Sequence, residues 1–294
     1  MYKRIINKIR QYREKIIHTL DYFITPINER IIINSWIKLK NNKVDSNNWG
    51  DDINYFLLQN LTNKRIFFFS FLIFPPKKNY LCIGSIIENL TNESSIIWGS
   101  GAMYGNKPLS VKPQKVLAVR GPLTRNYLIS NGIECPEIYG DPALLLPYYY
   151  KPAIEKKFKL GVIPHYVDRY NTYILDLMNR EPLKVKMINM KGYKYWQEVI
   201  DDICSCEFVI SSSLHGLIIS DAYNIPNTWV KFSDKISGGH FKYIDYFKSV
   251  NRQTLTPIHI DSPIYINGFD MSKWSPISFN PEPLLKCCPF NSKS

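Results

Sequence analysis

The sequence predicts an α/β protein with two Rossmann-like halves that face each other across a cleft. Short stretches rich in Ile, Val and aromatic residues alternate with stretches of helical periodicity, as in β-α-β units with parallel strands. The alternation forms two sets, and the Pro-, Tyr- and Lys-rich segment 147–158 between them is typical of a linker. Because ligands of such folds bind at the carboxyl ends of the strands, polar residues that follow a strand are candidates for function.

The composition is that of a globular protein with room for two domains. The chain has 294 residues, of which 45% are hydrophobic and 21% are charged, and this excludes a disordered chain. The formal net charge of +12 favours anionic partners. The basic residues are spread along the sequence without a nucleic-acid-binding motif. We therefore expect small anions and an anionic membrane surface as partners, and no nucleic acid.

Residues 1–40 are predicted to contain a basic amphipathic helix that ends at Pro26. Apolar residues recur at helical spacing, namely Ile5, Ile6, Ile9, Tyr12, Ile16 and Leu20. Basic residues fill much of the other face, namely Lys3, Arg4, Lys8, Arg10, Arg13 and Lys15. Two interpretations remain open: the helix lies on an anionic leaflet, or it packs on the body of the protein.

The first predicted domain spans residues 41–150. Strands are expected at 80–87, 96–101, 115–119 and 138–142. Asp51 lies where a Gly-Asp turn opens a helix, so it is a candidate for catalysis and equally an ordinary first-turn carboxylate. Ser100 lies in a Gly-Ser-Gly loop that lets the backbone approach a ligand closely. Arg120 directly follows the strand at 115–119.

The second predicted domain spans residues 151–250, and residues 251–294 are expected to form a tail along the surface. Strands are expected at 159–165, 185–190, 207–210 and 227–232. The first of these strands ends at His165. This imidazole should therefore lie at the same sheet edge as the loop that follows residue 210.

A polar turn after residue 210 holds the second group of candidates. Ser211, Ser212 and His215 lie between a strand and an apolar helix, whose first N–H groups favour anions. A Ser-rich helix cap followed by a structural histidine is the alternative interpretation. Further along, a Gly-Gly loop leads to His240 and Lys242, which could close over a ligand.

Missing motifs exclude several classes of function. The chain has no Walker lysine loop and no complete dinucleotide fingerprint, so we expect neither an NAD site nor ATP hydrolysis. A G-x-S-x-G elbow is absent, and the Cys and His spacing fits no zinc motif, so no metal is expected. The six cysteines are expected to be free thiols. Without a signal peptide or an apolar run of about 18 residues, the sequence points to the cytoplasm.

Seven segments of the two domains occur in the order typical of one family. They are NWGDDIN at 48–54, WGSG at 98–101, VRGPLT at 119–124, YGDP at 139–142, GVIPHYVD at 161–168, the stretch 211–226, and FKYIDYF at 241–247. In these segments, which cover roughly residues 45–250, the chain resembles the polysaccharide pyruvyl transferases, particularly bacterial exopolysaccharide and capsule members. The segments are weak individually and specific in combination.

The resemblance implies a GT-B-like arrangement, with an acceptor-side N-terminal domain and a donor-side C-terminal domain. It implies phosphoenolpyruvate as the donor, with no other cofactor. The acceptor would be a sugar of a surface polysaccharide or of its lipid-linked oligosaccharide precursor, and the product would be a pyruvate ketal. The expected location is the cytoplasm, at the inner face of the cytoplasmic membrane if the N-terminal helix binds lipid.

The resemblance also assigns residues. The family's central histidine corresponds to His215, and its donor-binding arginine corresponds to Arg120. Some relatives carry an arginine where this chain has Ser213, and the candidates to replace it are Arg125, Lys231 and Lys242.

These assignments give a mechanistic hypothesis. His215 would be the acid and base, because an imidazole suits proton transfer near neutral pH. Arg120 would clamp the carboxylate or phosphate of the donor, and Ser211 and Ser212 would bind phosphate oxygens. Asp51 and His165 would serve the acceptor side.

Two other functions remain open. A nucleotide-sugar glycosyltransferase of polysaccharide assembly would share the fold class. A non-catalytic scaffold of the assembly machinery would account for the basic N-terminus without any chemistry.

Overall fold

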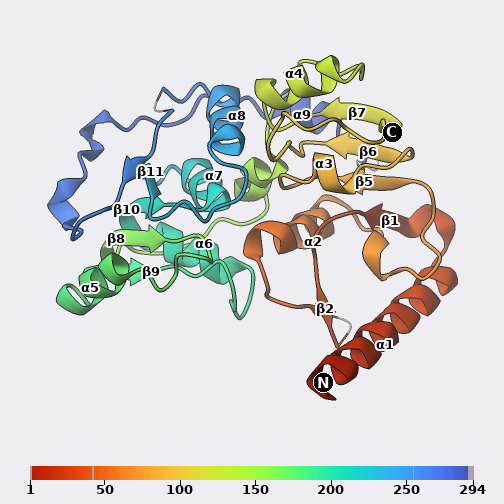
Figure 1. Cartoon of the computed structure of the whole chain (residues 1–294), viewed down its shortest axis with the longest axis horizontal. Helices are drawn as coiled ribbons and strands as arrows, with labels where there is room; N and C mark the ends of the chain where they lie inside the picture. Colours follow the sequence, from red (N-terminus) through yellow and green to blue (C-terminus); the bar gives the residue numbers. More distant parts are fainter. Residues whose placement is uncertain (1, 42, 254, 291–294) are drawn as a thin grey trace.

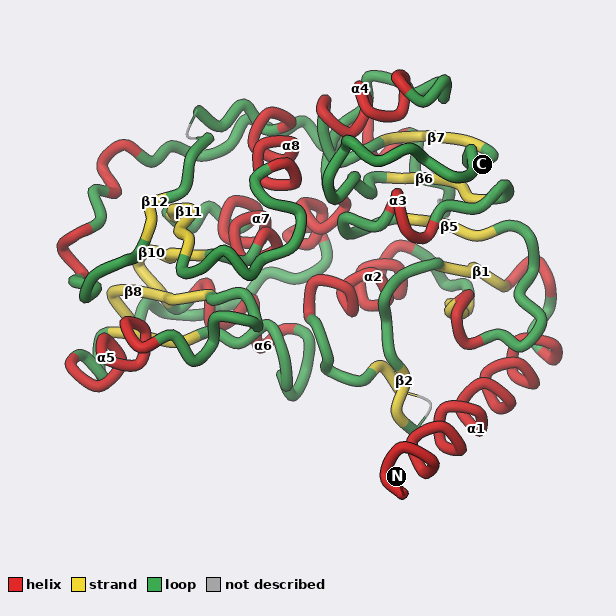
Figure 2. Tube along the Cα trace, viewed as in Figure 1, coloured by secondary structure: helices red, strands yellow, loops and turns green. Residues whose placement is uncertain are grey.

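Two five-stranded parallel sheets form the framework of the protein, one in each half of the chain (Figure 1). A computed structural model describes residues 2–41, 43–253 and 255–290. Figure 2 shows the strands in two separate groups, with helices and long loops around each of them. We call the two halves the N-terminal unit and the C-terminal unit. The class is α/β with Rossmann-like parallel sheets, as predicted.

The sheet of the N-terminal unit is parallel throughout. Its order is β4 (Arg65–Phe68), β1 (Arg30–Ile33), β5 (Asn79–Leu81), β6 (Ser95–Trp98) and β7 (Lys115–Ala118). A small antiparallel hairpin, β2 (Leu39–Lys40) and β3 (Lys43–Val44), follows β1. Strands β1, β4 and β6 are largely buried, which explains their nearly continuous apolar sequences.

The sheet of the C-terminal unit repeats the same topology. Its order is β12 (Ile258–His259), β11 (Asn227–Lys231), β10 (Cys206–Ser211), β8 (Phe158–Ile163) and β9 (Val185–Met187). Counted along the chain, both sheets have the order 2-1-3-4-5, which is one of the common doubly wound orders. Each sheet therefore has a switch point between its first and third strands, which are β1 and β5 in one unit and β8 and β10 in the other.

Helices cover the faces of both sheets. The N-terminal unit contains α2 (Trp49–Leu61), α3 (Ile87–Leu90) and α4 (Pro122–Ser130), and the C-terminal unit contains α5 (Thr172–Arg180), α6 (Gln197–Cys204), α7 (Leu214–Ala222) and α8 (Phe241–Ser249). Short 3-10 helices lie at η1 (Ile27–Glu29), η2 (Phe69–Phe71), η3 (Pro142–Tyr148), η4 (Ile266–Gly268) and η5 (Met271–Lys273). One apolar cluster includes buried residues of α2, η3, α6 and α7, so the core runs from one unit into the other.

Polar contacts also fix the two units against each other. The Trp49 indole at the start of α2 donates a hydrogen bond to the Trp196 carbonyl at 2.8 Å, and the Tyr193 hydroxyl donates to Asp52 at 2.9 Å. In Figure 1, α8 lies beside α4 of the other unit. Loops at the carboxyl ends of the two sheets are thereby held close together.

The N-terminal helix extends over α1 (Tyr2–Ile24) and ends before Pro26, as predicted. The side chains of Lys3, Arg4, Ile5, Ile6 and Lys8 lie outside the described part of the structure. Residues 30–33, which the sequence analysis left in the N-terminal segment 1–40 without predicting a strand, form β1. A strand of four residues is too short to show a sequence period of its own. Among the described residues, no helix has the length and hydropathy of a transmembrane span.

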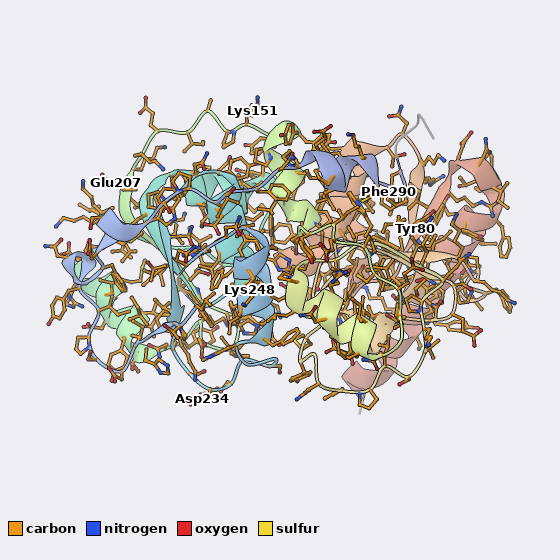
Figure 3. All side chains as sticks on the ribbon, turned by 90° about the horizontal axis from the view of Figure 1, so that it is seen from above. Tyr80, Lys151, Glu207, Asp234, Lys248 and Phe290 are labelled. Carbon is orange, nitrogen blue, oxygen red and sulfur yellow. The ribbon has the colours of Figure 1, made fainter. Side chains whose placement is uncertain are left out.

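The C-terminal segment is more than the surface tail that was expected for residues 251–294. It supplies β12 to the second sheet and then returns to the N-terminal unit as α9 (Glu282–Lys286). There the Leu284 carbonyl accepts a hydrogen bond from the Trp98 indole at 3.0 Å, and Phe290 packs against Tyr80, as Figure 3 shows. A two-residue strand and a five-residue helix are too short to produce a sequence period.

Candidate active site

A cleft of about 370 Å³ lies between the two units. Its walls are the loops after β1, β5, β8, β9 and β10, the start of α2, and the segment that leads into α8. Both switch points thus contribute to one cleft, which is where doubly wound folds bind their ligands. The lining residues are Trp36, Asn47, Asn48, Asp51, Gly84, Ser85, Ile86, Met103, His165, Tyr166, Met190, Lys191, Ser213, Leu214, His215, Lys235, Ser237 and Lys242.

The charges of this lining favour an anionic ligand. Lys191, Lys235 and Lys242 bring three ammonium groups to the cleft, and Asp51 brings the only carboxyl group among the lining residues. Cationic groups that converge in a cleft attract and hold anions.

His215 lies in the first turn of α7, at the position that the strand–turn–helix pattern predicts. Its ring rests against Gly50 in the first turn of α2. A Cβ atom at Gly50 would lie 2.1 Å from Nδ1 of His215, so this position requires glycine. Burial, together with the cations Arg120 and Lys242, lowers the pKa of His215 to about 3. The imidazole is therefore neutral at neutral pH.

Asp141 lies behind this imidazole. Its Oδ2 atom is 3.9 Å from Nε2 of His215, which is longer than the 2.7–3.2 Å that is typical of N–H···O hydrogen bonds. Within the described residues, Nε2 has no hydrogen-bond partner. Burial raises the pKa of Asp141 to about 7, although a hydrogen bond from the Ala143 backbone acts in the opposite direction. Asp141 is thus placed to orient the imidazole through Nε2.

Lys242 supplies a cation without a counterion in the first turn of α8. Its ammonium group makes no hydrogen bond or ion pair with any described residue, and its nearest recorded partner is the Tyr243 ring at 5.3 Å. Burial, with the neighbouring Arg120, lowers the pKa of Lys242 to about 8, whereas Asp51 acts to raise it. A buried, unpaired ammonium group gains most when an anion binds beside it.

The N-terminus of α7 lies in the same wall. Ser213 is the N-cap residue, but its side chain does not cap the helix. Ser213, Leu214 and His215 all line the cleft. The first N–H groups of α7 therefore add a positive potential close to Lys242.

Two more of the predicted site residues line the cleft. Asp51 accepts a hydrogen bond from the Asn48 side chain at 2.6 Å, and burial raises the pKa of Asp51 to about 6. His165 follows β8, and burial, with Lys242 nearby, lowers the pKa of His165 to about 4. The structure thus brings Asp51, His165, His215 and Lys242 into one cleft.

Arg120 differs from the expectation. It is fully buried and does not line the cleft. Its guanidinium group donates to Asp245 of α8 at 3.0 Å, to Ser85 at 2.5 Å and to the Ala102 carbonyl at 2.7 Å. In this structure Arg120 therefore forms a buried ion pair that connects the two units. The sequence could not reveal this, because the counterion lies on a distant helix.

The three serines are also buried rather than open to a ligand. The Ser211 hydroxyl donates to the Ser213 carbonyl at 2.9 Å, and the Ser212 hydroxyl accepts from the His165 backbone at 2.8 Å. Both bonds shape the turn that carries His215. Ser100 is buried as well, and its hydroxyl has no partner in the described structure. In this structure none of the three serines lines the cleft.

The remaining candidates lie outside the cleft. His240 stacks edge-on against Trp229 at 5.0 Å and lines a neighbouring small cavity. Arg125 pairs with Glu137 at 3.1 Å, and Lys231 pairs with Asp234. Of the three candidates to replace the arginine at Ser213, only Lys242 lines the cleft.

The sequence analysis missed four features of the site. Asp141 lies in the YGDP segment at the end of the predicted strand 138–142 but was not linked to His215, and Lys191, Lys235 and Trp36 were not singled out. For Asp141 the strand-end position was a usable signal. The two lysines lie in loops of a chain rich in lysine, so no pattern distinguished them.

A comparison with protein families identifies one family that matches the chain. The family model described as polysaccharide pyruvyl transferase matches residues 18–234. The match covers most of the chain, including parts of both units and the His215 turn. The chain belongs to the polysaccharide pyruvyl transferase family, and the protein is accordingly a transferase of polysaccharide pyruvylation.

Two relatives are similar over most of their length. An uncharacterized protein of Acanthamoeba polyphaga mimivirus is 29% identical over 204 residues, which are 68% of this chain and 69% of that protein. The succinoglycan biosynthesis protein ExoV of Rhizobium meliloti is 26% identical over 235 residues, which are 75% of this chain and 68% of that protein. No solved structure matches the chain significantly.

Proposed function

We propose that the protein transfers the pyruvyl group of phosphoenolpyruvate to a sugar of a surface polysaccharide or of its lipid-linked precursor, forming a pyruvate ketal. The observation that carries the proposal is one cleft that holds both an imidazole backed by a carboxyl group, His215 with Asp141, and an ammonium group without a counterion, Lys242. Family membership supports the transferred group, and the similarity to a succinoglycan biosynthesis protein supports a polysaccharide acceptor.

We assign the donor to the C-terminal wall of the cleft because of its negative charges. Phosphoenolpyruvate carries a carboxylate and a phosphate, and Lys242 with the N-terminus of α7 offers positive potential on the C-terminal wall of the cleft. Lys191 and Lys235 add two exposed cations to the cleft. Lys242 takes the place that the sequence analysis gave to Arg120.

Proton transfer is assigned to His215. With Nε2 directed at Asp141, the lone pair of Nδ1 is left for the substrate. In the first step an acceptor hydroxyl adds to C2 of the donor and gives its proton to His215, while the methylene carbon takes a proton from the carboxyl group of Asp51, whose pKa burial raises to about 6, and becomes a methyl group. In the second step the other hydroxyl displaces phosphate from C2. Phosphate leaves with the electron pair of the broken C–O bond, and the second hydroxyl proton passes to the Asp51 carboxylate.

The acceptor is assigned to the opposite wall. Asp51 and Asn48 at the start of α2 and Trp36 after β1 present a carboxyl group, an amide and an aromatic face, which suit the hydroxyls and the apolar faces of a sugar ring. His165 lies across from them. We propose that the two units are arranged as in GT-B enzymes, with the acceptor on the N-terminal unit, and that the reaction takes place in the cytoplasm.

A donor panel tests the proposal. Purified protein is incubated with lipid-linked oligosaccharide acceptors and either phosphoenolpyruvate or nucleotide sugars, and products are measured by mass spectrometry and phosphate release. We expect phosphoenolpyruvate alone to release phosphate and to add to the acceptor the mass of one pyruvate minus one water. Transfer of a glycosyl group would support the glycosyltransferase instead, and no turnover with any donor would support the scaffold.

A further inference from the structure

Helix α1 turns an apolar stripe away from the protein body. In Figure 1, α1 runs along the outer edge of the N-terminal unit. Seven large apolar side chains of its described part are exposed, and apart from Ile17 they follow one side of the helix: Ile9, Tyr12, Ile16, Leu20, Phe23 and Ile24. They recur every three or four residues and so share one side of the helix. We call these six residues the outer stripe.

The opposite side of α1 is fixed to the N-terminal unit by polar contacts. The Phe68 backbone donates a hydrogen bond to Nε2 of His18 at 2.9 Å, and the Ile73 backbone donates to Thr19 at 3.0 Å. Tyr22 is buried against Phe67. The helix is therefore anchored by its more polar side, which is the reverse of a surface helix that covers an apolar core. The outer stripe is exposed because of this fixed orientation.

The exposure of the stripe is large. Ile9, Leu20 and Ile24 are 65%, 61% and 79% exposed, respectively. Contiguous apolar surface of this kind is typical of interfaces with proteins or membranes rather than of free protein surface.

The charges around the outer stripe favour a membrane over a protein partner. The exposed Arg10 and Arg13 flank the outer stripe. The two acidic residues of α1 lie elsewhere, since Glu14 is buried and Asp21 pairs with Arg65. Two copies joined through this face would bring their arginines together, whereas an anionic bilayer supplies both hydrocarbon and negative charge.

A neighbouring loop also presents exposed apolar and basic side chains. Ile73, which bonds to Thr19, begins a segment that continues through Phe74 to Lys77 and Lys78. Phe74 is 71% exposed, and both lysines are exposed. An aromatic side chain next to basic residues is a common feature of surfaces that bind at the lipid headgroup level.

We propose that α1 is a membrane-docking helix, whose outer stripe inserts into the headgroup region of an anionic lipid bilayer while Arg10 and Arg13 contact the lipid phosphates. The helix would lie parallel to the membrane plane. The hairpin β2–β3 contacts α1 through Asn41, whose side chain accepts from Arg10 at 2.7 Å, and the segment around it leads to Trp36 and Asn47 of the cleft. Docking would therefore hold the cleft near the bilayer surface. This proposal is independent of the donor assignment.

Vesicle flotation tests the proposal with the full chain. The probes are vesicles of phosphatidylcholine, with and without phosphatidylglycerol. We expect flotation with the anionic vesicles, which salt weakens because the charges of the leaflet are screened. Leu20→Glu and Ile16→Glu should each lower the partition coefficient about tenfold or more, since each removes a large apolar side chain from the membrane interface. Arg13→Glu should lower it about fivefold or more.

Control variants distinguish docking through α1 from nonspecific binding to vesicles. Leu183→Glu changes an apolar residue that is 86% exposed outside α1, and we expect unchanged flotation. Circular dichroism of each variant checks folding. Equal flotation of Leu20→Glu and wild type, or equal binding to neutral and anionic vesicles, would overturn the proposal. So would a dimer in analytical ultracentrifugation without vesicles that Leu20→Glu dissociates, because a second copy would then cover the stripe.

Discussion

Nε2 of His215 and Oδ2 of Asp141 face each other at 3.9 Å, although one residue begins α7 and the other precedes η3. The carboxyl group is fully buried, and the imidazole lines the cleft. Apart from this carboxyl group, Nε2 has no polar partner in the described structure. The pair therefore defines which nitrogen of His215 is available to substrate, and the distance can shorten to a hydrogen bond when the cleft is filled.

Asp141→Asn tests this orientation. Asparagine can still accept the Ala143 hydrogen bond at the start of η3, so the fold should be retained. An amide, however, cannot stabilise an imidazolium, and it can favour the wrong tautomer of His215. We expect kcat for pyruvyl transfer to fall by about 10²-fold or more with little change in the KM for phosphoenolpyruvate. Steady-state kinetics with phosphate detection measure both values, and an unchanged kcat would remove Asp141 from the mechanism.

Gly50→Ala tests the packing of the same imidazole from the other side. Alanine favours the helix by about 1 kcal/mol over glycine, yet its Cβ would lie 2.1 Å from Nδ1 of His215. The ring must then move, and we expect a folded protein with a loss of activity of about 10²-fold. Gly268→Ala is the matched control, because nothing lies within 4 Å of its Cβ position. Full activity of Gly50→Ala would show that the position of the ring is unimportant.

The lowered pKa of Lys242 predicts that activity falls at alkaline pH, which we call the alkaline limit. Its pKa is lowered to about 8 by burial, so the ammonium group loses its proton, and with it the attraction for the donor, as the pH rises through this value. We expect kcat/KM for phosphoenolpyruvate to fall about tenfold per pH unit above pH 8. Lys242→Arg keeps its charge at high pH, so the limit should move out of the measured range.

A second Lys242 variant tests donor binding directly. Lys242→Met should raise the KM for phosphoenolpyruvate about tenfold or more, because a charge-assisted contact in a buried site is lost. Lys248→Met alters an exposed lysine of the same helix and should have no effect. If Lys242→Arg keeps the alkaline limit, or if Lys242→Met leaves the KM unchanged, another group binds the donor.

Arg120 is predicted to act on stability. Arg120→Met leaves the Asp245 carboxylate buried without its counterion, which we expect to lower the free energy of unfolding by about 3–5 kcal/mol. Asp245 also accepts hydrogen bonds from the backbone and hydroxyl of Thr124. The double variant Arg120→Met with Asp245→Asn should therefore recover much of the loss, since the amide can keep a hydrogen bond without a charge. Denaturant titration measures these values. If Arg120→Met instead has normal stability and a sharply raised KM for phosphoenolpyruvate, Arg120 binds the donor as the sequence analysis predicted.

Much of the fold was predictable because parallel strands are short apolar stretches between helices. Strands β5 to β11 all overlap segments assigned from the sequence. The failures have physical reasons. Strand β1 has only four residues and lies in the N-terminal segment, for which only a helix was predicted. Strand β12 pairs through only two residues, and the segment 138–142 contributes only the single bridge of Tyr139 to Val119.

The site was predictable where a side chain follows its strand directly. His165 and His215 reach the cleft because the ends of β8 and β10 lie next to each other at a switch point. Ser211 and Ser212 share this position, yet their hydroxyls turn inward, since the bonds they make depend on the pairing of β10 with β8. Similarly, Arg120 is buried because it pairs with Asp245, whereas Lys242 lines the cleft without a counterion. The position of Asp245 depends on how α8 packs on α4, which the sequence does not show.

The most direct test of the account is the turnover of His215→Asn with phosphoenolpyruvate and a lipid-linked acceptor. Asparagine has a similar polarity but cannot carry a proton at neutral pH. We predict that acceptor-dependent phosphate release and ketal formation fall together by about 10²–10⁴-fold in a protein that remains folded. Ketal formation near the wild-type rate would contradict the assignment of proton transfer to His215 and, with it, the proposed chemistry of the cleft.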